Sequence, residues 1–282
     1  MPRVLIAGCG YLGQAAADLF RAADWEVEAW TQSVESSAKL SGRQYPVHGV
    51  DISESTQLGA RPGNFDAVIH CASTRGGDAE VYRRVYLAGA RNLLERFPAS
   101  RTLFTSSTSV YAQKSGEWVT EESPGEPNHE TGKILREAEQ LVLSKGGIVA
   151  RLAGIYGPNR SALLSRFLRG EAVVDLKQDR FINQIHRDDA AGAFVLLLDR
   201  PSAKGGIFNV VDDQPILLSD CYRWLAEHLK RLPGTNASST SKGKRGASNK
   251  RVSNAKLRGT GWTMRYPNFA EGMEKSVLPN FL

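Results

Sequence analysis

Short apolar runs alternate with longer amphipathic stretches through the first half of the chain. The run at 3–8 (RVLIAG) predicts a buried strand, and the apolar residues at helical spacing in 11–23 predict a helix. Strands that alternate with helices indicate βαβ units, and therefore a parallel sheet with helices on both faces. Further strands are expected at 26–31, 44–50, 66–72, 101–111 and 147–157, and further helices at 79–97 and after Pro127.

The alternation becomes less regular after residue 160. We expect the fold class to be α/β, a Rossmann-type doubly wound parallel sheet, with the C-terminal third forming a small lid on the substrate side. The expected division is a dinucleotide-binding domain at 1–160 and a mostly C-terminal substrate-side region at 161–282, interleaved with the sheet. The expected elements here are helices at 161–169, 188–199 and 218–231 and strands at 181–185 and 206–211.

Composition limits the class of protein. The 282 residues are 41% hydrophobic and 23% charged, which is ordinary for a soluble globular protein. The first residues lack the features of a signal peptide, and no apolar run is long enough to span a membrane. The three cysteines have no paired spacing, which indicates a reducing compartment, and the cytoplasm is the expected location. No metal-ligand spacing occurs.

The net charge of +6 comes from one segment. Residues 234–258 carry seven lysines and arginines and no acid, so the other residues together sum to −1. The Gly/Ser/Thr/Lys composition predicts a flexible basic loop at about 234–249, and a nucleic-acid contact is the less favoured alternative. We expect 236–249 to be dispensable and 250–258 to be ordered, because Val252 and Leu257 can anchor the second stretch.

A GxGxxG motif follows the first predicted strand directly and opens an Ala-rich helix. This context is typical of dinucleotide-binding sites. Gly8 permits the tight turn, Gly10 allows the backbone to approach a pyrophosphate, and Gly13 allows close packing of helix and strand. The phosphates would bind at the helix N-terminus, where free N–H groups and the helix dipole favour anions.

The end of the second strand bears on the choice of cofactor. NAD-specific sites usually place an acid there, but this strand ends in Thr31, Gln32 and Ser33, and the first acid is Glu35. Neutral hydroxyls tolerate a 2′-phosphate, so NADP is expected and NAD stays open. Asp51, after the third strand, is placed to meet the edge of the adenine ring.

Motifs along nearly the whole chain resemble those of the short-chain dehydrogenase/reductase superfamily, in its extended or atypical type, the NAD-dependent epimerase/dehydratase-like group. The matching stretches are AGCGYLG, VDIS, DAVIHCAS, GARNLLE, TSSTSVYA, GKILREAEQL, RLAGIYGP, IHRDDAA, FNVVDDQP and the closing KRVSNAKLRGTGWTMRYPNFAEG. They occur in the family's order.

The resemblance implies further cofactor contacts. Ala72 and Ser73 would line the cofactor where the fourth strand ends, and the loop after the sixth strand would lie near the nicotinamide carboxamide. The residues implied in addition to those already named are Tyr11, Leu12, Ile52, Cys71, Lys133, Ile155, Tyr156, Gly157 and Pro158.

The resemblance also implies catalytic positions. Ser107, four residues before Tyr111, matches the catalytic Ser/Thr whose hydroxyl would hydrogen-bond a substrate oxygen. Lys133 matches the lysine that contacts the nicotinamide ribose and lowers the pKa of a catalytic tyrosine.

That tyrosine is missing. None of the eight tyrosines has a lysine four residues later, and the matching position holds His129. A histidine has a suitable pKa for proton transfer, but the surrounding PNHETGK also differs from the usual motif, so we favour an ordinary helix-start residue. The other candidate proton donors are Tyr111, Ser107 and His186.

Two other polar residues, His186 and Arg151, have structural interpretations as well. His186 is expected to cap or tether the helix that follows, with Asp188 and Asp189 as first-turn acids favoured by the helix dipole. Arg151 could bind a substrate anion or pair with a carboxylate.

The leading hypothesis is an NADP(H)-dependent oxidoreductase or epimerase acting on a small hydroxy or oxo compound or a sugar nucleotide. The alternative is a non-catalytic NAD(P)-binding sensor or scaffold. Such a protein would not need the catalytic tyrosine that is missing from this sequence. A small-molecule substrate is the expected partner, without a membrane or nucleic acid, and the expected state is a monomer or a homodimer.

Overall fold

The computed structural model describes residues 1–61, 63–74, 76–172, 179–231 and 248–281. Its centre is a seven-stranded sheet in the order β11-β7-β5-β4-β1-β2-β3, in which every neighbouring pair is parallel. The strands β1, β4, β5, β7 and β11 are almost wholly buried, as expected for a sheet covered on both faces, whereas the edge strand β3 is half-buried. They are β1 (Arg3–Ala7), β2 (Glu26–Thr31), β3 (Val47–Gly49), β4 (Ala67–His70), β5 (Arg101–Ser107), β7 (Ile148–Leu152) and β11 (Ile207–Val210).

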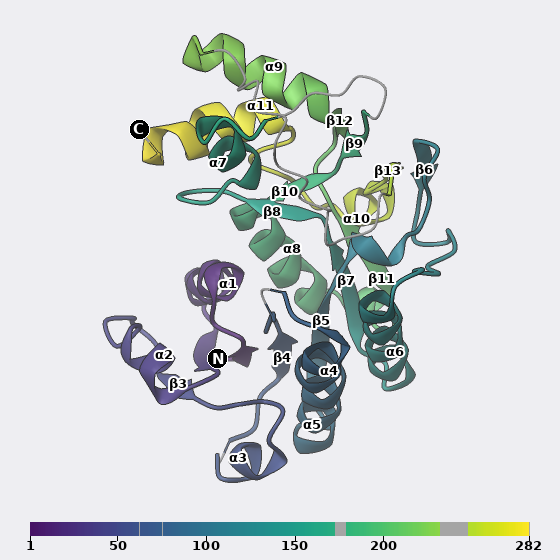
Figure 1. Cartoon of the computed structure of the whole chain (residues 1–282). Helices are drawn as coiled ribbons and strands as arrows, with labels where there is room; N and C mark the ends of the chain where they lie inside the picture. The colour runs from purple at the N-terminus through teal and green to yellow at the C-terminus, as the bar shows by residue number, and fades with distance from the viewer. Residues whose placement is uncertain (62, 75, 173–178, 232–247, 282) are drawn as a thin grey trace.

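Helices cover both faces of this sheet (Figure 1). On one face α1 packs against α8, and on the other α6 packs against the long helix formed by α4, η1 and α5. These elements are α1 (Tyr11–Ala22), α8 (Arg187–Asp199), α6 (Glu130–Ser144), α4 (Ala79–Tyr82), the π-helix η1 (Arg83–Ala88) and α5 (Gly89–Arg96). Shorter helices in this part are α2 (Val34–Ala38), α3 (Ser55–Gly59) and the 3-10 turn η2 (Thr108–Val110).

The remaining elements form what we call the C-terminal lobe, at the top of Figure 1. It has its own apolar core, which includes the buried Tyr156, Phe167 and Phe269. Three two-stranded sheets belong here: β8–β10, β9–β12 and β6–β13. The strands are β6 (Glu117–Val119), β8 (Gly154–Tyr156), β9 (Phe181–Ile182), β10 (Gln184–His186), β12 (Ile216–Leu217) and β13 (Lys250–Val252). The helices are α7 (Ala162–Leu168), α9 (Leu218–Leu229), α10 (Ala255–Gly259), α11 (Phe269–Gly272), η5 (Met273–Val277) and η6 (Leu278–Asn280). The exception among the remaining elements is the 3-10 turn η4 (Pro201–Ala203), which follows α8 at the other edge of the sheet, where Arg101 at the start of β5 donates to Arg200 O at 2.7 Å.

The predicted Rossmann-type doubly wound sheet is confirmed. The lobe is connected into the sheet, because β11 adds to β7 after the chain has passed through β8, α7 and α8. The single strand predicted at 147–157 is in fact two strands, β7 and β8. The first ends at Leu152, and Gly154–Tyr156 leaves the sheet to pair with β10.

One other boundary differs from expectation. The helix expected at 79–97 is continuous but contains the π-helical segment η1. Of the basic loop expected at about 234–249, residues 234–247 lie outside the described residues. Asn249, at its expected end, donates its N–H to Gln113 O at 3.0 Å and accepts from Phe181 N at 3.0 Å. Val252 and Leu257 are buried.

Candidate dinucleotide and substrate site

The predicted site residues converge because parallel strands end at one edge of a sheet. Gly8 follows β1, Thr31 ends β2, and Asp51 lies two residues past β3. Cys71 follows β4, and Ser107 ends β5. Five neighbouring strands therefore deliver these residues to the same carboxyl edge, where doubly wound folds bind their ligands.

The three glycines of the motif differ in what their missing side chains permit. Gly8 has a φ of +108°, and a Cβ there would lie 2.2 Å from the backbone nitrogen of Ala72. A Cβ on Gly13 would lie 2.3 Å from the Gly8 carbonyl oxygen. A Cβ on Gly10 would meet no atom within 4 Å. Packing therefore requires Gly8 and Gly13, whereas Gly10 leaves open space at the start of α1.

The N-terminus of α1 has no anionic partner of its own. Its cap residue is Gly10, no side chain caps the helix, and the first turn contains no acid. The first N–H groups of a helix lack intrahelical acceptors, and the dipole adds partial positive charge. Cys71 N donates to Ala7 O at 2.7 Å, which holds the segment of Cys71, Ala72 and Ser73 beside this loop. An anion such as a phosphate fits this position.

The polar residues past β2 and β3 are held by local bonds. The Thr31 hydroxyl donates to the Ser33 carbonyl at 3.2 Å, and the Ser33 hydroxyl accepts from Ser36 N at 3.3 Å. Asp51 accepts from the backbone and the hydroxyl of Ser53 at 3.0 and 2.7 Å. Burial alone would raise the pKa of Asp51, but these hydrogen bonds outweigh it and the pKa is lowered. Asp51 is therefore an ionised acceptor beside the buried Ile52.

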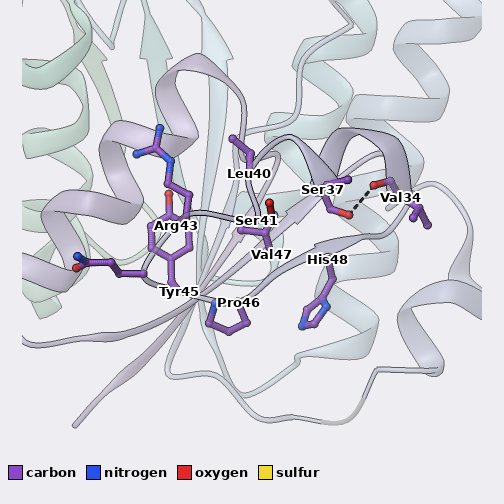
Figure 2. A pocket seen from close by; sticks show the side chains of 11 residues that line it. Val34, Ser37, Leu40, Ser41, Arg43, Tyr45, Pro46, Val47 and His48 are labelled. Atoms are coloured by element: carbon purple, nitrogen blue, oxygen red, sulfur yellow. Dashed lines mark hydrogen bonds between the residues drawn. The ribbon is translucent and has the colours of Figure 1, made fainter.

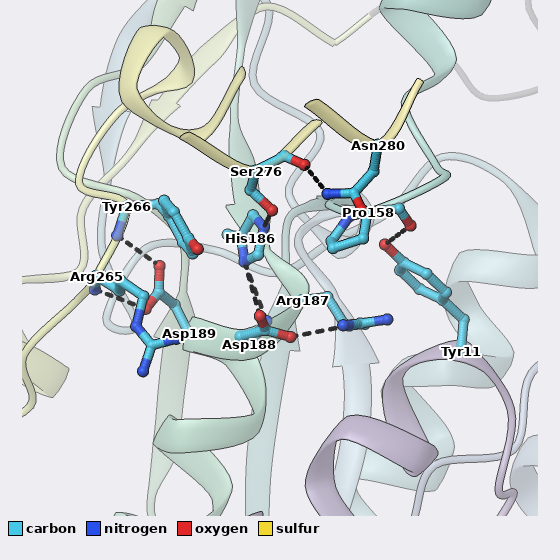
Figure 3. Close-up of polar contacts among 10 residues, drawn as sticks. All are labelled: Tyr11, Pro158, His186, Arg187, Asp188, Asp189, Arg265, Tyr266, Ser276 and Asn280. Atoms are coloured by element: carbon cyan, nitrogen blue, oxygen red, sulfur yellow. Dashed lines mark hydrogen bonds and ion pairs between the residues drawn. The ribbon is translucent and has the colours of Figure 1, made fainter. Parts of the chain in front are cut away.

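Tyr11 connects the glycine-rich loop to the C-terminal lobe (Figure 3). Its hydroxyl donates to the Pro158 carbonyl at 3.0 Å. The guanidinium carbons of Arg160 and Arg187 lie 5.0 and 4.8 Å from its ring centroid. Burial raises the pKa of Tyr11, so this phenol stays protonated at neutral pH. The next residue, Leu12, is buried and packs into the core.

Ser107 lies at the same carboxyl edge of the sheet. It is half-buried, ends β5 and caps η2, where its Oγ accepts from Ser109 N at 3.1 Å. Because the oxygen is used as an acceptor, the hydroxyl proton is available to donate to another oxygen.

Tyr111 lies in the interior, with 1% of its surface exposed. Its hydroxyl donates to Asn209 Oδ1 at 2.9 Å and accepts from Arg151 Nη1 at 2.8 Å. Burial raises its pKa further above the ordinary value. These bonds commit Tyr111 to the core, and we do not assign it a role as proton donor.

Arg151 pairs with a carboxylate, which settles the alternative left open by the sequence. Its Nε and Nη2 donate to the two carboxylate oxygens of Glu139 at 3.0 and 2.8 Å, and both residues are buried. Glu139 also accepts from the Ser106 hydroxyl at 2.6 Å and from Arg136. This network joins α6, β5 and β7 directly beneath the Ser107 turn. Sequence reasoning missed Glu139, although an acid between the apolar Ala138 and Val142 was a usable signal.

The first turn of α6 presents two predicted site residues differently. Lys133 is exposed, and its ammonium has no partner within the described ranges. His129 is the half-buried N-cap residue, with no side-chain capping bond. Its ring packs over Gly132, where a Cβ would lie 2.9 Å from His129 Cε1. Lys133 is free to reach a ligand, whereas His129 is placed as a helix-start residue.

Tyr156 turns away from the sheet edge. Its side chain is 1% exposed in the core of the C-terminal lobe, and its hydroxyl donates to Asn268 O at 3.3 Å. A cofactor contact from Tyr156 would therefore come from its backbone. Its neighbour Ile155 is half-buried.

The prediction that His186 caps the following helix is confirmed. Its Nδ1 accepts from Asp188 N at 3.2 Å, and its Nε2 bonds the Ser276 hydroxyl at 2.9 Å (Figure 3). Burial lowers the pKa of His186 to about 4, so the ring is neutral. With Nδ1 as acceptor, the proton is on Nε2, and the ring donates to Ser276 instead of serving it as a base.

Asp188 and Asp189 both lie in the first turn of α8, as expected, and Asp189 also has a long-range partner. It accepts from the backbone N–H groups of Arg265 and Tyr266 at 2.7 and 3.0 Å, so it fastens the C-terminal segment to α8 (Figure 3). Asp188 instead receives a hydrogen bond from Arg187 at 2.9 Å.

Two surface hollows lie apart from these residues. One, of about 620 Å³, lies between α2 and β3 and includes Ser37 and Tyr45 (Figure 2). Ser37 donates back to Val34 O at 2.8 Å, so this hydroxyl is already used within the hollow. The second, of about 450 Å³, lies on the C-terminal lobe between Trp118 and Phe269. Neither hollow contains a predicted site residue, and we place the site by the strand ends instead.

Two further features are absent from the described part of the chain. No group of three His, Cys, Asp or Glu side chains there could hold a metal ion. No helix in the same ranges has the length and apolar character needed to cross a membrane.

Comparisons with known proteins agree with this geometry. The structure resembles a putative NAD-dependent epimerase/dehydratase from Methylobacillus flagellatus (27% identity, 97% of both chains, TM-score 0.77). It also resembles the UDP-glucose 4-epimerase of Thermus thermophilus in complex with NAD (20% identity, 96% of both chains, TM-score 0.79). A third similar structure is the UDP-glucose 4-epimerase of Thermotoga maritima with UDP-glucose (16% identity, 99% of this chain and 98% of that one, TM-score 0.80).

No curated protein matches the sequence. The family profile described as NAD dependent epimerase/dehydratase family, in contrast, matches residues 4–210, well over half of the chain. The resemblance inferred from the motifs is thus confirmed. The chain belongs to the NAD-dependent epimerase/dehydratase family.

Proposed function

We propose that this protein is an NAD(P)-dependent oxidoreductase or epimerase acting on a small hydroxy or oxo compound or a sugar nucleotide. The observation that carries the proposal is the open space at Gly10, at the uncapped N-terminus of α1. Similar structures support it, since that of the Thermus thermophilus UDP-glucose 4-epimerase is a complex with NAD and that of the Thermotoga maritima enzyme contains UDP-glucose.

The residues present fit a dinucleotide. The α1 N-terminus from Gly10 to Gly13 would hold the diphosphate, and Asp51 would accept from the adenine side. We propose NADP as the preferred form because Thr31 and Ser33 are neutral, and no carboxylate at the end of β2 would repel a 2′-phosphate. The nicotinamide ring, when bound, supplies hydride transfer.

The chain's own groups would act on the substrate oxygen. The Ser107 hydroxyl would donate a hydrogen bond to that oxygen, since its own oxygen already accepts from Ser109 N. Lys133 would hold the nicotinamide ribose with its unpaired ammonium. A proton would pass to or from the substrate through His129 or water, because Tyr111 is committed to Asn209 and Arg151.

The proposal is tested by titrating the protein with NADPH and NADH, followed by nicotinamide fluorescence. Saturable binding, tighter for NADPH, is expected. Hydride transfer is then assayed over a panel of carbonyl compounds, hydroxy acids and sugar nucleotides. Failure to bind either cofactor would overturn the assignment.

A second candidate is a non-catalytic dinucleotide-binding sensor or scaffold. The specific observation in its favour is that the position four residues before Lys133 holds His129, whose side chain makes no capping bond and packs over Gly132. Cofactor binding without turnover of any compound in the panel would favour this reading.

Lys133→Met is expected to weaken NADP(H) binding by about 1–2 kcal/mol, the scale of losing a charge-assisted hydrogen bond. The physical reason is that Lys133 is exposed, without an ion pair in the described structure, and therefore available to the ribose. Fluorescence titration measures the effect. Lys145→Met, the same change at the other end of α6, is the matched control and should leave affinity unchanged. Equal losses in both variants would show a general effect of helix charge.

His129→Ala is expected to lower kcat/KM less than about tenfold, below the 10²–10⁴ of a general acid or base. The reason is that no hydrogen bond from the described residues fixes the tautomer of the His129 ring. Steady-state kinetics on the best substrate of the panel measures it, with Ser107→Ala as the comparison that should lose far more. A loss of two orders of magnitude, with fold and cofactor affinity intact, would instead make His129 the substitute for the tyrosine.

A further inference from the structure

Two arginines lie beside Tyr11, the residue that begins α1. The guanidinium carbon of Arg160 lies 5.0 Å from the centroid of the Tyr11 ring, and that of Arg187 lies 4.8 Å from it. Arg160 belongs to the turn between β8 and α7, whereas Arg187 begins α8, which packs against α1. Figure 3 shows the side chain of Arg187 pointing towards Tyr11. Two positive charges from later parts of the chain therefore lie near the start of the helix proposed to hold the cofactor diphosphate.

The turn that carries Arg160 is fixed against Tyr11. The Tyr11 hydroxyl donates to Pro158 O at 3.0 Å. Gly157 and Arg160 exchange backbone hydrogen bonds at 2.9 and 3.0 Å, which close the turn. Gly157 has a φ of +152°, and a Cβ there would lie 2.8 Å from the Tyr11 hydroxyl and 3.4 Å from Arg187 Cβ. A glycine at this position thus lets the turn pack closely against both α1 and α8, and this packing places the two arginines.

Most N–H groups of these two guanidinium groups have no acceptor among the residues that the structure places. Arg160 is exposed and its side chain forms no hydrogen bond or ion pair there, and Arg187 uses its Nε on Asp188 at 2.9 Å. A cation–π contact holds a guanidinium in place without giving its N–H groups an oxygen acceptor. A guanidinium held in this way suits a phosphate, which it can bind through two parallel hydrogen bonds.

The charges next to Tyr11 leave a positive excess. Among the described residues, Asp188 is the one acid that pairs with either guanidinium. Tyr11 adds no negative charge, because burial raises the pKa of its phenol and keeps it neutral. The start of α1 adds positive potential, since no acid occupies its first turn and no side chain caps it. Positive charges gathered in this way repel one another and favour an anionic ligand.

We propose that Arg160 and Arg187 bind the diphosphate of the dinucleotide cofactor together with the N-terminus of α1. This rests on the proposed function and deepens it, because it adds side chains outside the glycine-rich motif to the cofactor site. The glycine-rich turn supplies backbone N–H groups, and the arginines add charge-assisted hydrogen bonds, which are stronger than neutral ones. Since NADH and NADPH share the diphosphate, both cofactors should depend on the two arginines to the same extent.

The first test compares three ligands. Arg160→Gln and Arg187→Gln should each weaken binding of NADH, NADPH and ADP-ribose about tenfold, the scale of one charge-assisted hydrogen bond. Calorimetry on the full-length protein measures each affinity. ADP-ribose carries the diphosphate without the nicotinamide, so equal losses for all three ligands support the proposal. A loss confined to NADPH would assign the arginines to the 2′-phosphate, and a loss that spares ADP-ribose would assign them to the nicotinamide end. Either result would overturn it.

Further variants separate binding from support of the fold. Arg169→Gln is the matched control, because Arg169 is also exposed but pairs with Glu171 at 2.8 Å, and it should leave all three affinities unchanged. Arg187→Lys keeps the positive charge and should retain more affinity than Arg187→Gln. Thermal unfolding without ligand checks each protein. If Arg187→Gln does not fold, the exposed Arg160 decides through Arg160→Gln. Wild-type affinity for ADP-ribose in the folded variants would refute the assignment.

The salt dependence provides a second readout that a purely structural role would not change. Salt screens charge interactions, so the wild-type affinity for ADP-ribose should fall as the NaCl concentration rises. The double variant Arg160→Gln with Arg187→Gln should show a shallower dependence, because two of the screened charges are gone. The same slope in the wild type and in the double variant would count against the proposal.

Failure of this proposal can be told apart from failure of the proposed function. If the wild type binds NADH or NADPH and the arginine variants bind them equally well, the arginine assignment is wrong and the proposed function stands. If the wild type binds none of the three ligands, the proposed function itself falls, and the role of the two arginines falls with it.

Discussion

Gly10→Asp is expected to lower the affinity for NADPH and NADH more than 100-fold while leaving the protein folded. The two expectations have separate physical causes. A side chain at Gly10 meets no protein atom within 4 Å, so folding tolerates it. The same open space lies where a diphosphate would bind, and a carboxylate there adds both bulk and repulsion. Fluorescence titration measures affinity, and thermal unfolding followed by circular dichroism measures the fold.

Two other glycines provide matched controls for this variant. Gly42→Asp introduces the same side chain at another position with no atom within 4 Å, and should leave cofactor affinity unchanged. Gly8→Ala should fail differently, by destabilising the fold, because its Cβ would meet the Ala72 backbone at 2.2 Å. Normal cofactor binding by a folded Gly10→Asp protein would refute the location of the site.

Arg151→Met is expected to lower the free energy of unfolding by about 3 kcal/mol, the lower end for a broken buried ion pair, because it leaves the buried carboxylate of Glu139 with only Arg136 and Ser106 as donors. Both carboxylate oxygens of Glu139 accept from Arg151, and the Tyr111 hydroxyl also loses its donor. Urea unfolding followed by circular dichroism measures the difference.

A control variant shows whether the loss of stability comes from breaking a buried ion pair or from breaking any ion pair. Arg169 pairs with Glu171 on the surface, where salt bridges contribute about 0–1 kcal/mol, so Arg169→Met should have little effect. The double variant Arg151→Met with Glu139→Leu should recover much of the loss, because it removes the unpaired charge. A loss below about 1 kcal/mol in Arg151→Met would mean that Arg136 alone is enough to stabilise the Glu139 carboxylate.

The parts of the fold that depend on local patterns could be predicted from the sequence. The β1–glycine–α1 unit is an example, since strand, turn and helix follow each other within residues 3–22. His186 is another, because an N-cap bonds the backbone two residues later. The common edge that holds Ser107 also followed, since alternating strands and helices imply parallel strands.

Long-range side-chain partners could not be predicted. Tyr111 and Asn209 are 98 residues apart, and nothing near Tyr111 in the sequence indicates that its hydroxyl is enclosed. The same holds for Lys250, which the composition placed at the border of a solvated basic loop. Its burial depends on β13 pairing with β6, more than 100 residues earlier. The basic residues near Lys250 in the sequence thus suggested that it is exposed to solvent, whereas it is buried.

The late return of β11 to the sheet affects how the protein can be made. During synthesis, one edge of β7 has no partner strand until residues 207–210 have left the ribosome and can pair with it as β11. An apolar strand with a free edge is a template for aggregation. A shortened chain that stops near residue 160 would keep that edge permanently and should be insoluble, even though it contains the whole glycine-rich turn. Residues 1–160, the predicted first domain, are therefore not expected to fold as a separate unit when the chain is cut there.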